Sequence, residues 1–256
     1  GVFDENRYFQ AGTECPVFII NGIHVGVNIC EDIWYPMGPT TLQVHRGAEV
    51  IVNINSSPYH AGKGGIREKI LATRASDECV IISHTNSVGG QDELIFDGNS
   101  MVVDEKGELI VRGKQFEEDL VLSDLDVEAV FRSRLHDPRR RKEKLTFERE
   151  EARAPKIVVS QESSVGPKPP LPHRDIKTYE PLEEIYAALV LGTHDYVRKN
   201  GFQKVVIGLS GGIDSALVTV IAVDALGSEN VIGVAMPSQY SSPEGNRDAQ
   251  LLADNL

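Results

Sequence analysis

The chain has 256 residues, of which 41% are hydrophobic and 25% charged, with 38 Asp and Glu against 26 Lys and Arg and a formal net charge of −12. This composition is typical of globular domains and excludes a mainly disordered chain. No apolar run approaches the ~20 residues of a membrane span, and the acidic balance disfavours a nucleic-acid binder, which needs surplus Lys and Arg. The 3 cysteines form no C-x-x-C pair, so they predict a reducing, cytoplasmic setting.

Both ends of the chain interrupt a pattern. The sequence opens on Gly1 without an initiator Met or a signal segment, and it stops at DAQLLADNL (248–256), inside an amphipathic helical pattern. We therefore expect a piece of a longer protein that lacks sequence on both sides.

The first half alternates short apolar runs with turns. Residues 17–20 and 24–29 flank the pair Asn21-Gly22, the strongest short signal for a β-hairpin. Residues 40–48 predict a helix, and the β-branched run 50–54 that follows is typical of a buried strand.

The same alternation continues toward the middle of the chain. Residues 66–78 have helical spacing and lead into a predicted strand at 79–83. Residues 100–104 and 108–112 predict a second hairpin, and 120–125 a further strand. Many strands with few helices predict a layered α+β domain.

The composition changes between the halves. Residues 132–153 mix both signs of charge, and the basic cluster 139–142 is balanced by nearby acids, so we expect a solvated or contact surface rather than a nucleic-acid site. Residues 160–172 are rich in Pro and Ser without periodicity, which is typical of a linker.

The second half predicts a βαβ unit. An amphipathic helix at 181–198 comes first. A short buried strand at 204–209, a helix at 216–226 and a strand at 231–236 follow. This order requires a parallel sheet and an α/β domain.

A Ser- and Gly-rich turn, SGGIDS (210–215), joins the first strand of this unit to its helix. Glycines let the backbone approach a ligand, and a helix N-terminus favours anions, so the turn predicts a phosphate or pyrophosphate site. It is neither a P-loop, because no Lys follows the glycines, nor a G-x-G-x-x-G turn. The alternative is a plain Gly turn in which Ser caps the helix.

The turn resembles the pyrophosphatase loop of the N-type ATP pyrophosphatases, and MPSQYSSPEGNRDAQLLADNL (236–256) resembles their NAD synthetase branch. The resemblance implies that Asp214 helps to hold Mg²⁺, a hard cation that prefers oxygen ligands. It also implies that ATP binds to Gly208, Leu209, Ser210, Gly211, Gly212, Ile213, Asp214, Ser215 and Met236.

An apolar strand delivers Cys30 into an acidic pair and a turn, in VNICEDIW (27–34). A Cys at a strand end is usually a small core residue. This segment, however, resembles the nucleophile elbow of the nitrilase superfamily, in its glutamine-amidase branch. The resemblance implies that Cys30 attacks the amide carbon of glutamine, assisted by a Glu general base and by a Lys that supports the oxyanion.

A second segment, NINSSPYHAGK (53–63), resembles the part of the amidases that holds glutamine. The resemblance implies that Ser57 and Lys63 bind the amino-acid end of glutamine and that Glu31 holds the substrate or orients the site. The alternatives are an ordinary turn hydroxyl for Ser57, a solvated Lys63 and a structural Glu31.

The family's catalytic Lys and Glu and a substrate-binding Tyr would lie upstream of Gly1. We therefore assign those roles to no residue here and expect the 256 residues alone to lack glutaminase activity. Cys15 and Cys79 are predicted to be core or turn residues, and Trp34 to pack beside the elbow.

Together, in this order, the motifs resemble the glutamine-dependent NAD synthetases. The resemblance implies a nitrilase-like α+β sandwich in part (1–155), a linker (156–178) and part of an α/β ATP-pyrophosphatase domain (179–256). It implies a ligase that uses glutamine, ATP and nicotinic acid adenine dinucleotide, and a homo-oligomer. The alternatives are another glutamine- or ammonia-dependent ATP-pyrophosphatase amidotransferase and an inactive truncated scaffold.

Overall fold

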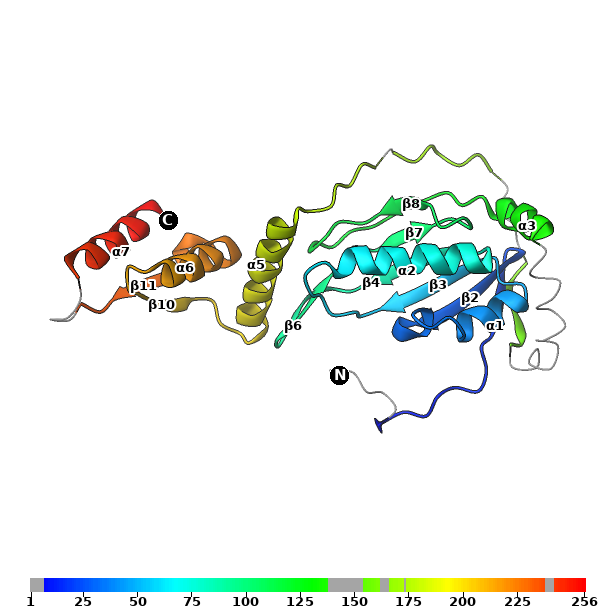
Figure 1. Cartoon of the computed structure of the whole chain (residues 1–256), viewed down its shortest axis with the longest axis horizontal. Helices are drawn as coiled ribbons and strands as arrows, with labels where there is room; N and C mark the ends of the chain where they lie inside the picture. Colours follow the sequence, from blue (N-terminus) through cyan, green and yellow to red (C-terminus); the bar gives the residue numbers. More distant parts are fainter. Residues whose placement is uncertain (1–6, 138–153, 162–165, 173, 238–241) are drawn as a thin grey trace.

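The computed structural model describes residues 7–137, 154–161, 166–172, 174–237 and 242–256. A larger unit is built on a seven-stranded sheet, and a smaller unit is built on a two-stranded sheet. Figure 1 shows helix α5 (Pro181–Lys199) standing between the larger unit and the remainder of the smaller one. The predicted α+β first part and α/β second part are confirmed.

The larger unit begins with the predicted hairpin. Strands β1 (Val17–Ile20) and β2 (Ile23–Ile29) pair antiparallel around Asn21 and Gly22. Both turn residues have positive φ, 52° and 84°, which is why Asn and Gly stand there.

The sheet has the strand order β8-β7-β4-β3-β2-β1-β9. Its centre is parallel, from β2 through β3 to β4, and β1 also pairs parallel with β9. The β4–β7 and β7–β8 pairs are antiparallel, and the latter is the second predicted hairpin. These strands are β3 (Val50–Asn55), β4 (Ile81–Asn86), β7 (Met101–Val103), β8 (Leu109–Arg112) and β9 (Lys156–Ser160).

Helices cover both faces of this sheet, because its strands alternate apolar side chains between the faces. On one face, α1 (Pro39–His45) and α2 (Lys63–Glu78) enclose the main core, to which Ile51, Leu71 and Ile82 belong. On the other face, α3 (Val127–His136) buries Val130 against Val50 and Ile81.

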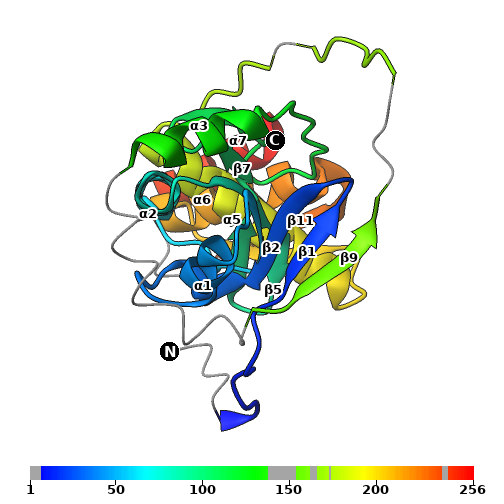
Figure 2. The same ribbon diagram turned by 90° about the vertical axis from the view of Figure 1, so that its right-hand side faces the viewer.

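The structure corrects several predicted elements. Residues 120–125, predicted as a strand, pair with no strand in the described part of the chain, and Leu120 is 76% exposed. The strand predicted at 79–83 begins at Ile81, because Cys79 ends α2 in the left-handed conformation. Residues 156–160, assigned to the linker, form β9, which lies beside β1 at the sheet edge (Figure 2).

A separate hairpin, β5 (Val88–Gln91) with β6 (Leu94–Asp97), was not predicted and lies under α5. The remaining elements are β10 (Val205–Leu209), α6 (Ile213–Leu226), β11 (Val231–Ala235) and α7 (Pro243–Asn255), with short 3-10 turns at Cys30–Ile33 (η2) and Ser228–Asn230 (η4). Strands β10 and β11 pair parallel, which confirms the βαβ unit. Strand β10 is less buried than predicted, since Val206 is 67% exposed.

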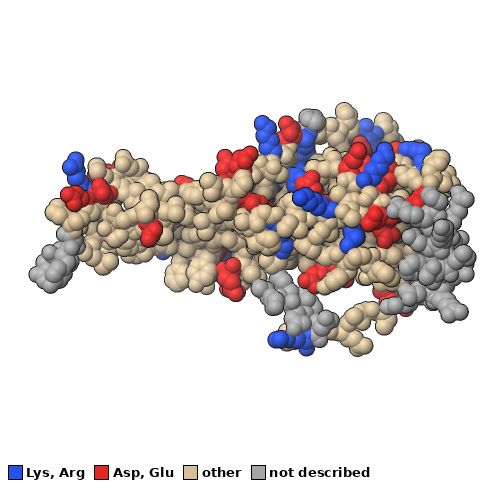
Figure 3. Space-filling model, in the orientation of Figure 1, with Lys and Arg blue, Asp and Glu red and all other residues tan. Residues whose placement is uncertain are grey.

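None of the described helices combines the length and apolar character needed to cross a bilayer. Figure 3 shows acidic and basic side chains interspersed over the larger unit, with no continuous basic stripe on the described part of this face. The basic cluster 139–142 lies outside the described residues.

Candidate functional site

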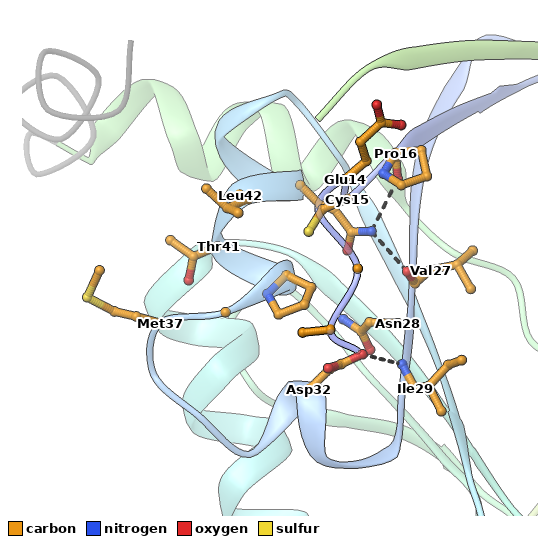
Figure 4. A pocket seen from close by; sticks show the side chains of 15 residues that line it. Glu14, Cys15, Pro16, Val27, Asn28, Ile29, Asp32, Met37, Thr41 and Leu42 are labelled. Carbon is orange, nitrogen blue, oxygen red and sulfur yellow. Dashed lines mark hydrogen bonds between the residues drawn. The ribbon is translucent and has the colours of Figure 1, made fainter. Parts of the chain in front are cut away.

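The predicted elbow forms where β2 ends and the short turn η2 begins. Cys30 has a positive φ of 46°, a backbone conformation that costs a non-glycine residue roughly 1–3 kcal/mol and is often found at functional sites. The Asp32 carboxylate accepts a hydrogen bond from Ile29 N at 2.9 Å (Figure 4). Trp34 N donates to Glu31 O at 2.9 Å. These bonds hold a half-buried Cys30 at the carboxyl end of the sheet's parallel centre.

Buried amides hold this turn from below. Asn53 Nδ2 donates to Asn28 Oδ1 at 2.7 Å and to the Cys30 carbonyl oxygen at 3.4 Å. Asn28 Nδ2 donates in turn to Thr40 Oγ1 at 2.8 Å. Asn53 is fully buried, so this network fixes the geometry of the elbow rather than binding solvent.

The next strand extends the network through His84. Strand register places Asn28, Asn53 and His84 side by side on β2, β3 and β4. Burial, and after it the charge of Arg67, lowers the pKa of His84 to about 3, so the ring is neutral near pH 7. His84 Nδ1 lies 2.9 Å from Asn53 Oδ1 and 3.1 Å from Asn55 Nδ2, so the ring joins the amide network through this nitrogen.

Lys63 lies at the start of α2 and is not a solvated surface residue. Its Nζ donates to the Pro58 carbonyl oxygen at 2.6 Å and lies 5.7 Å from the centroid of the Trp34 ring. This distance permits a cation–π interaction. Trp34 packs against the main core, as predicted.

Charged groups of the elbow affect the pKa of Lys63. Burial, and after it the Arg67 guanidinium, lowers the pKa of Lys63. The charges of Cys30, Glu31 and Asp97 oppose this shift, so these groups lie within electrostatic reach of the Lys63 amine. Lys63 also lies over Trp34, whose N–H binds the Glu31 carbonyl oxygen, so its amine borders the turn that carries Cys30 and Glu31.

Ser57, the remaining predicted residue of this site, is buried in the loop between β3 and α2. It is only 3% exposed, and its N–H donates to Asn86 Oδ1 at 2.9 Å. Asn86 Nδ2 donates to Asp97, which binds Arg67 through two hydrogen bonds of 2.9 and 3.0 Å. The loop that carries Ser57 is thus linked through Asn86 to the buried Arg67–Asp97 ion pair.

A cavity of about 540 Å³ opens beside the elbow, between residues 11–16, the end of β2 and the start of α1 (Figure 4). It is lined by Ile29 and Asp32, which flank Cys30, but not by Cys30 itself. Cys15 also lines it, whereas we predicted a core or turn residue. Cys79 fits that prediction, since it is buried and ends α2.

The predicted phosphate turn lies between β10 and α6. Gly211 has a φ of 78°, and a Cβ there would clash with the carbonyl oxygen of Gly245 in the first turn of α7. Glycine is therefore required both by the turn and by the close approach of α7. The turn, together with Asp248 and Leu252 of α7, lines a cavity of about 450 Å³.

Hydroxyl groups shape this turn. Ser210 Oγ accepts from Gly212 N at 3.2 Å, while Ser215 Oγ accepts from Ser210 N at 3.3 Å and donates to Gly212 O at 3.0 Å. Two of the turn's amides, those of Ser210 and Gly212, are therefore bonded within the turn. The first N–H groups of α6, beginning at Ile213, have no carbonyl partner within the helix, and the helix dipole favours an anion there.

Met236 and Asp214 complete the predicted ATP residues. A Cβ at Gly208 would lie 3.2 Å from Met236 Cε, so the exposed Met236 side chain covers the end of β10. Asp214 is exposed in the first turn of α6. The described residues contain no group of three or more His, Cys, Asp or Glu that could hold a metal. A single carboxylate completed by phosphate oxygens and waters nevertheless fits Mg²⁺.

Sequence comparison divides the chain in the same way. The family model for carbon–nitrogen hydrolases matches residues 1–134, and the model for NAD synthase matches residues 185–256.

Several relatives match the entire chain. Glutamine-dependent NAD(+) synthetases of Thermotoga maritima and Aquifex aeolicus are 50% and 49% identical, over 100% of this chain and 44% of theirs. The structure of a glutamine-dependent NAD+ synthetase from Acinetobacter baumannii in complex with adenosine diphosphate has 38% identity and a TM-score of 0.74, over 98% of this chain and 40% of that one. The chain spans less than half the length of these relatives.

Proposed function

The chain belongs to the carbon–nitrogen hydrolase family, and on this premise we propose that the protein containing it is a glutamine-hydrolysing NAD synthetase. One observation carries the proposal. A Cys elbow and a Ser–Gly phosphate turn occur in one chain, in the order found in full-chain relatives named glutamine-dependent NAD(+) synthetase.

In the first site, the Cys30 sulfur attacks the amide carbon of glutamine. The carbonyl oxygen takes up the electron pair, and the Glu31 N–H, next after the nucleophile, donates to this oxyanion. The proton of the Cys30 thiol is transferred to the amide nitrogen, and collapse of the adduct then expels ammonia and leaves a thioester, which water hydrolyses to glutamate and the free thiol. Ser57 and Lys63 bind the amino-acid end of glutamine, and Glu31 orients it. The position of Lys63 near Cys30 and Glu31 supports this assignment.

In the second site, the turn Ser210–Ser215 binds the pyrophosphate of ATP at the N-terminus of α6. The carboxylate of nicotinic acid adenine dinucleotide attacks the α-phosphorus and pyrophosphate leaves. Ammonia then attacks the activated carbonyl, which releases AMP and forms the amide of NAD. Asp214 would hold Mg²⁺, which supplies charge neutralisation at the phosphates.

The organisation of the protein is part of the proposal. We place an amidase domain in the first part of the chain and a synthetase domain from residue 179 on, and we extend the first domain through β9, because this strand pairs with β1. We also propose that the protein is a homo-oligomer and that it is cytoplasmic; three free cysteines suit a reducing compartment. Size-exclusion chromatography with light scattering tests the oligomer, and a monomeric mass would contradict it.

The alternatives predict different products. An amidotransferase with another acceptor would not cleave ATP in the presence of nicotinic acid adenine dinucleotide, and an inactive scaffold would cleave nothing. The NAD synthase match at residues 185–256 favours the dinucleotide. The test is phosphorus NMR of the natural full-length protein with ATP, glutamine and the dinucleotide. We expect AMP, pyrophosphate and NAD; ADP and phosphate, or no reaction, would overturn the proposal.

A further inference from the structure

Helix α2, which begins at the predicted glutamine-binding residue Lys63, starts without a cap of its own. Its N-cap is Gly62, in the left-handed conformation with a φ of 78°. Because glycine has no side chain, the N-cap residue cannot accept a hydrogen bond from the first-turn N–H groups. Its first turn holds no acidic residue and begins with Lys63, whose positive charge opposes the helix dipole.

A carboxylate from the other unit makes the bond to the N-cap N–H that the Glu of a capping box would make. Glu184 of α5 accepts a hydrogen bond from Gly62 N at 3.2 Å through Oε2 and another from Gln115 Nε2 at 3.3 Å through Oε1. Glu184 and Gln115 are 8% and 6% exposed. Gln115 is held in turn by Tyr179 N, which donates to its Oε1 at 2.9 Å.

No salt bridge to Glu184 is present among the residues that the structure describes. A buried carboxylate without a cation is costly unless another positive field compensates it. The N-terminus of α2 supplies such a field, which explains a carboxylate rather than an amide at this position.

The aromatic side chains around Glu184 reach the same loop. Tyr59 packs edge-on to Phe116, with ring centroids 5.3 Å apart, and Phe116 stacks on Tyr179 at 6.2 Å. Burial, and after it the charge of Glu184, raises the pKa of Tyr59 to about 12. The loop from Ser57 to Lys63 is thus fixed at one end by Asn86 and at the other by Glu184.

We propose that Glu184 is a positioning residue for the glutamine site: from the synthetase unit it caps α2 and so fixes the loop that carries Ser57 and Lys63. The inference rests on the proposed function, because it assigns glutamine to that loop. It makes the affinity for glutamine depend on a residue of the other domain, which touches neither the substrate nor Cys30.

The test uses Glu184→Gln in the natural full-length protein. The amide keeps the shape but loses the charge and one acceptor, so we expect KM for glutamine to rise about fivefold, equivalent to about 1 kcal/mol at 1.4 kcal/mol per tenfold. We expect kcat to change less than about twofold, since the elbow is untouched. Glutamate formation gives both constants, and pyrophosphate–ATP exchange reports the synthetase site, which should keep its rate.

Asp195→Asn is the matched control. Asp195 lies on the same helix and also joins the units, by accepting from Gly90 N at 2.7 Å, but it contacts the β5 hairpin instead of α2. If Glu184 only docks the domains, both variants will change KM alike, which overturns the proposal. If E184Q does not fold, Glu184→Asp carries the test with the same expected rise in KM, because the shorter side chain no longer reaches Gly62 N.

A double-mutant cycle with Lys63→Ala tests the route of the effect. If Glu184 acts by placing Lys63, E184Q will raise KM little further in the K63A protein, whereas a fully additive effect would overturn the proposal. Wild-type protein that forms no glutamate would instead refute the proposed function. Wild-type protein that hydrolyses glutamine, with KM unchanged in E184Q, refutes only this inference.

Discussion

The buried amide network under the elbow gives the sharpest prediction. Asn53→Leu replaces the amide by a side chain with the same branching but no polar atoms. It removes the donor to Asn28 Oδ1 and to the Cys30 carbonyl, and the contact between Asn53 Oδ1 and His84 Nδ1. Each buried polar group left without a partner costs about 1–3 kcal/mol, so the three groups that lose Asn53 predict a loss of at least roughly 3 kcal/mol in the free energy of unfolding.

Activity should fall with stability, because the turn that aims the Cys30 sulfur loses its support. Misplacement of a reacting group can cost up to about 100-fold, and we expect kcat for glutamine hydrolysis to drop about 10- to 100-fold. Urea unfolding and glutamate release measure the two effects. The control is Ile54→Val, on the opposite face of β3 and 52% exposed, which should change stability by less than ~0.5 kcal/mol. An N53L loss below ~1 kcal/mol with unchanged kcat would refute the reasoning.

Three further predictions concern other parts of the molecule. Arg67→Met leaves the fully buried Asp97 without its cation and should cost about 3–5 kcal/mol in urea unfolding, against less than ~1 kcal/mol for Arg132→Met in an exposed pair; equal losses would contradict this. Gly211→Ala should lower pyrophosphate–ATP exchange at least about tenfold, because its Cβ strikes Gly245, whereas Gly65→Ala, with open space around it, should leave exchange unchanged. The native pKa of His84, about 3, lies below its unfolded value of about 6.5, so His84 stabilises the fold above pH ~6.5 and loses that contribution as pH falls toward 3, by up to about 1.4 kcal/mol per unit. His84→Asn should remove this part of the slope between pH ~6.5 and ~4, and an unchanged slope would count against the buried neutral ring.

The sequence could predict what local pattern encodes. The Asn21-Gly22 hairpin, the parallel β10–β11 pair and the helix after the SGGIDS turn all follow from turn chemistry and periodicity within a few residues. Strand β9 could not be found in this way, because its partner β1 lies far away in the sequence. Residues 120–125 show the reverse case. Their apolar alternation predicts a strand, but they have no pairing partner among the described residues.

Some residues of the candidate site could likewise be identified from the sequence, and others could not. Cys30 and the phosphate turn stand at the ends of strands, where sequence motifs can identify them. The supporting residues Asn28, Asn53 and His84 occur in separate strands, and only the sheet register aligns them. Their one local signal is a polar residue inside an otherwise apolar run. Glu184 carried no signal, because its role depends on how α5 lies against the loop before α2.

The central claim is that Cys30 releases the nitrogen that the phosphate-turn site builds into NAD. The most direct measurement supplies the full-length protein with ATP, nicotinic acid adenine dinucleotide and glutamine labelled with ¹⁵N in its side-chain amide, and follows the label by mass spectrometry. We expect the ¹⁵N to enter the carboxamide of NAD with wild-type protein and not with Cys30→Ala, while pyrophosphate–ATP exchange continues in both. Labelled NAD from the Cys30→Ala protein, or unlabelled NAD from the wild type, would contradict the account.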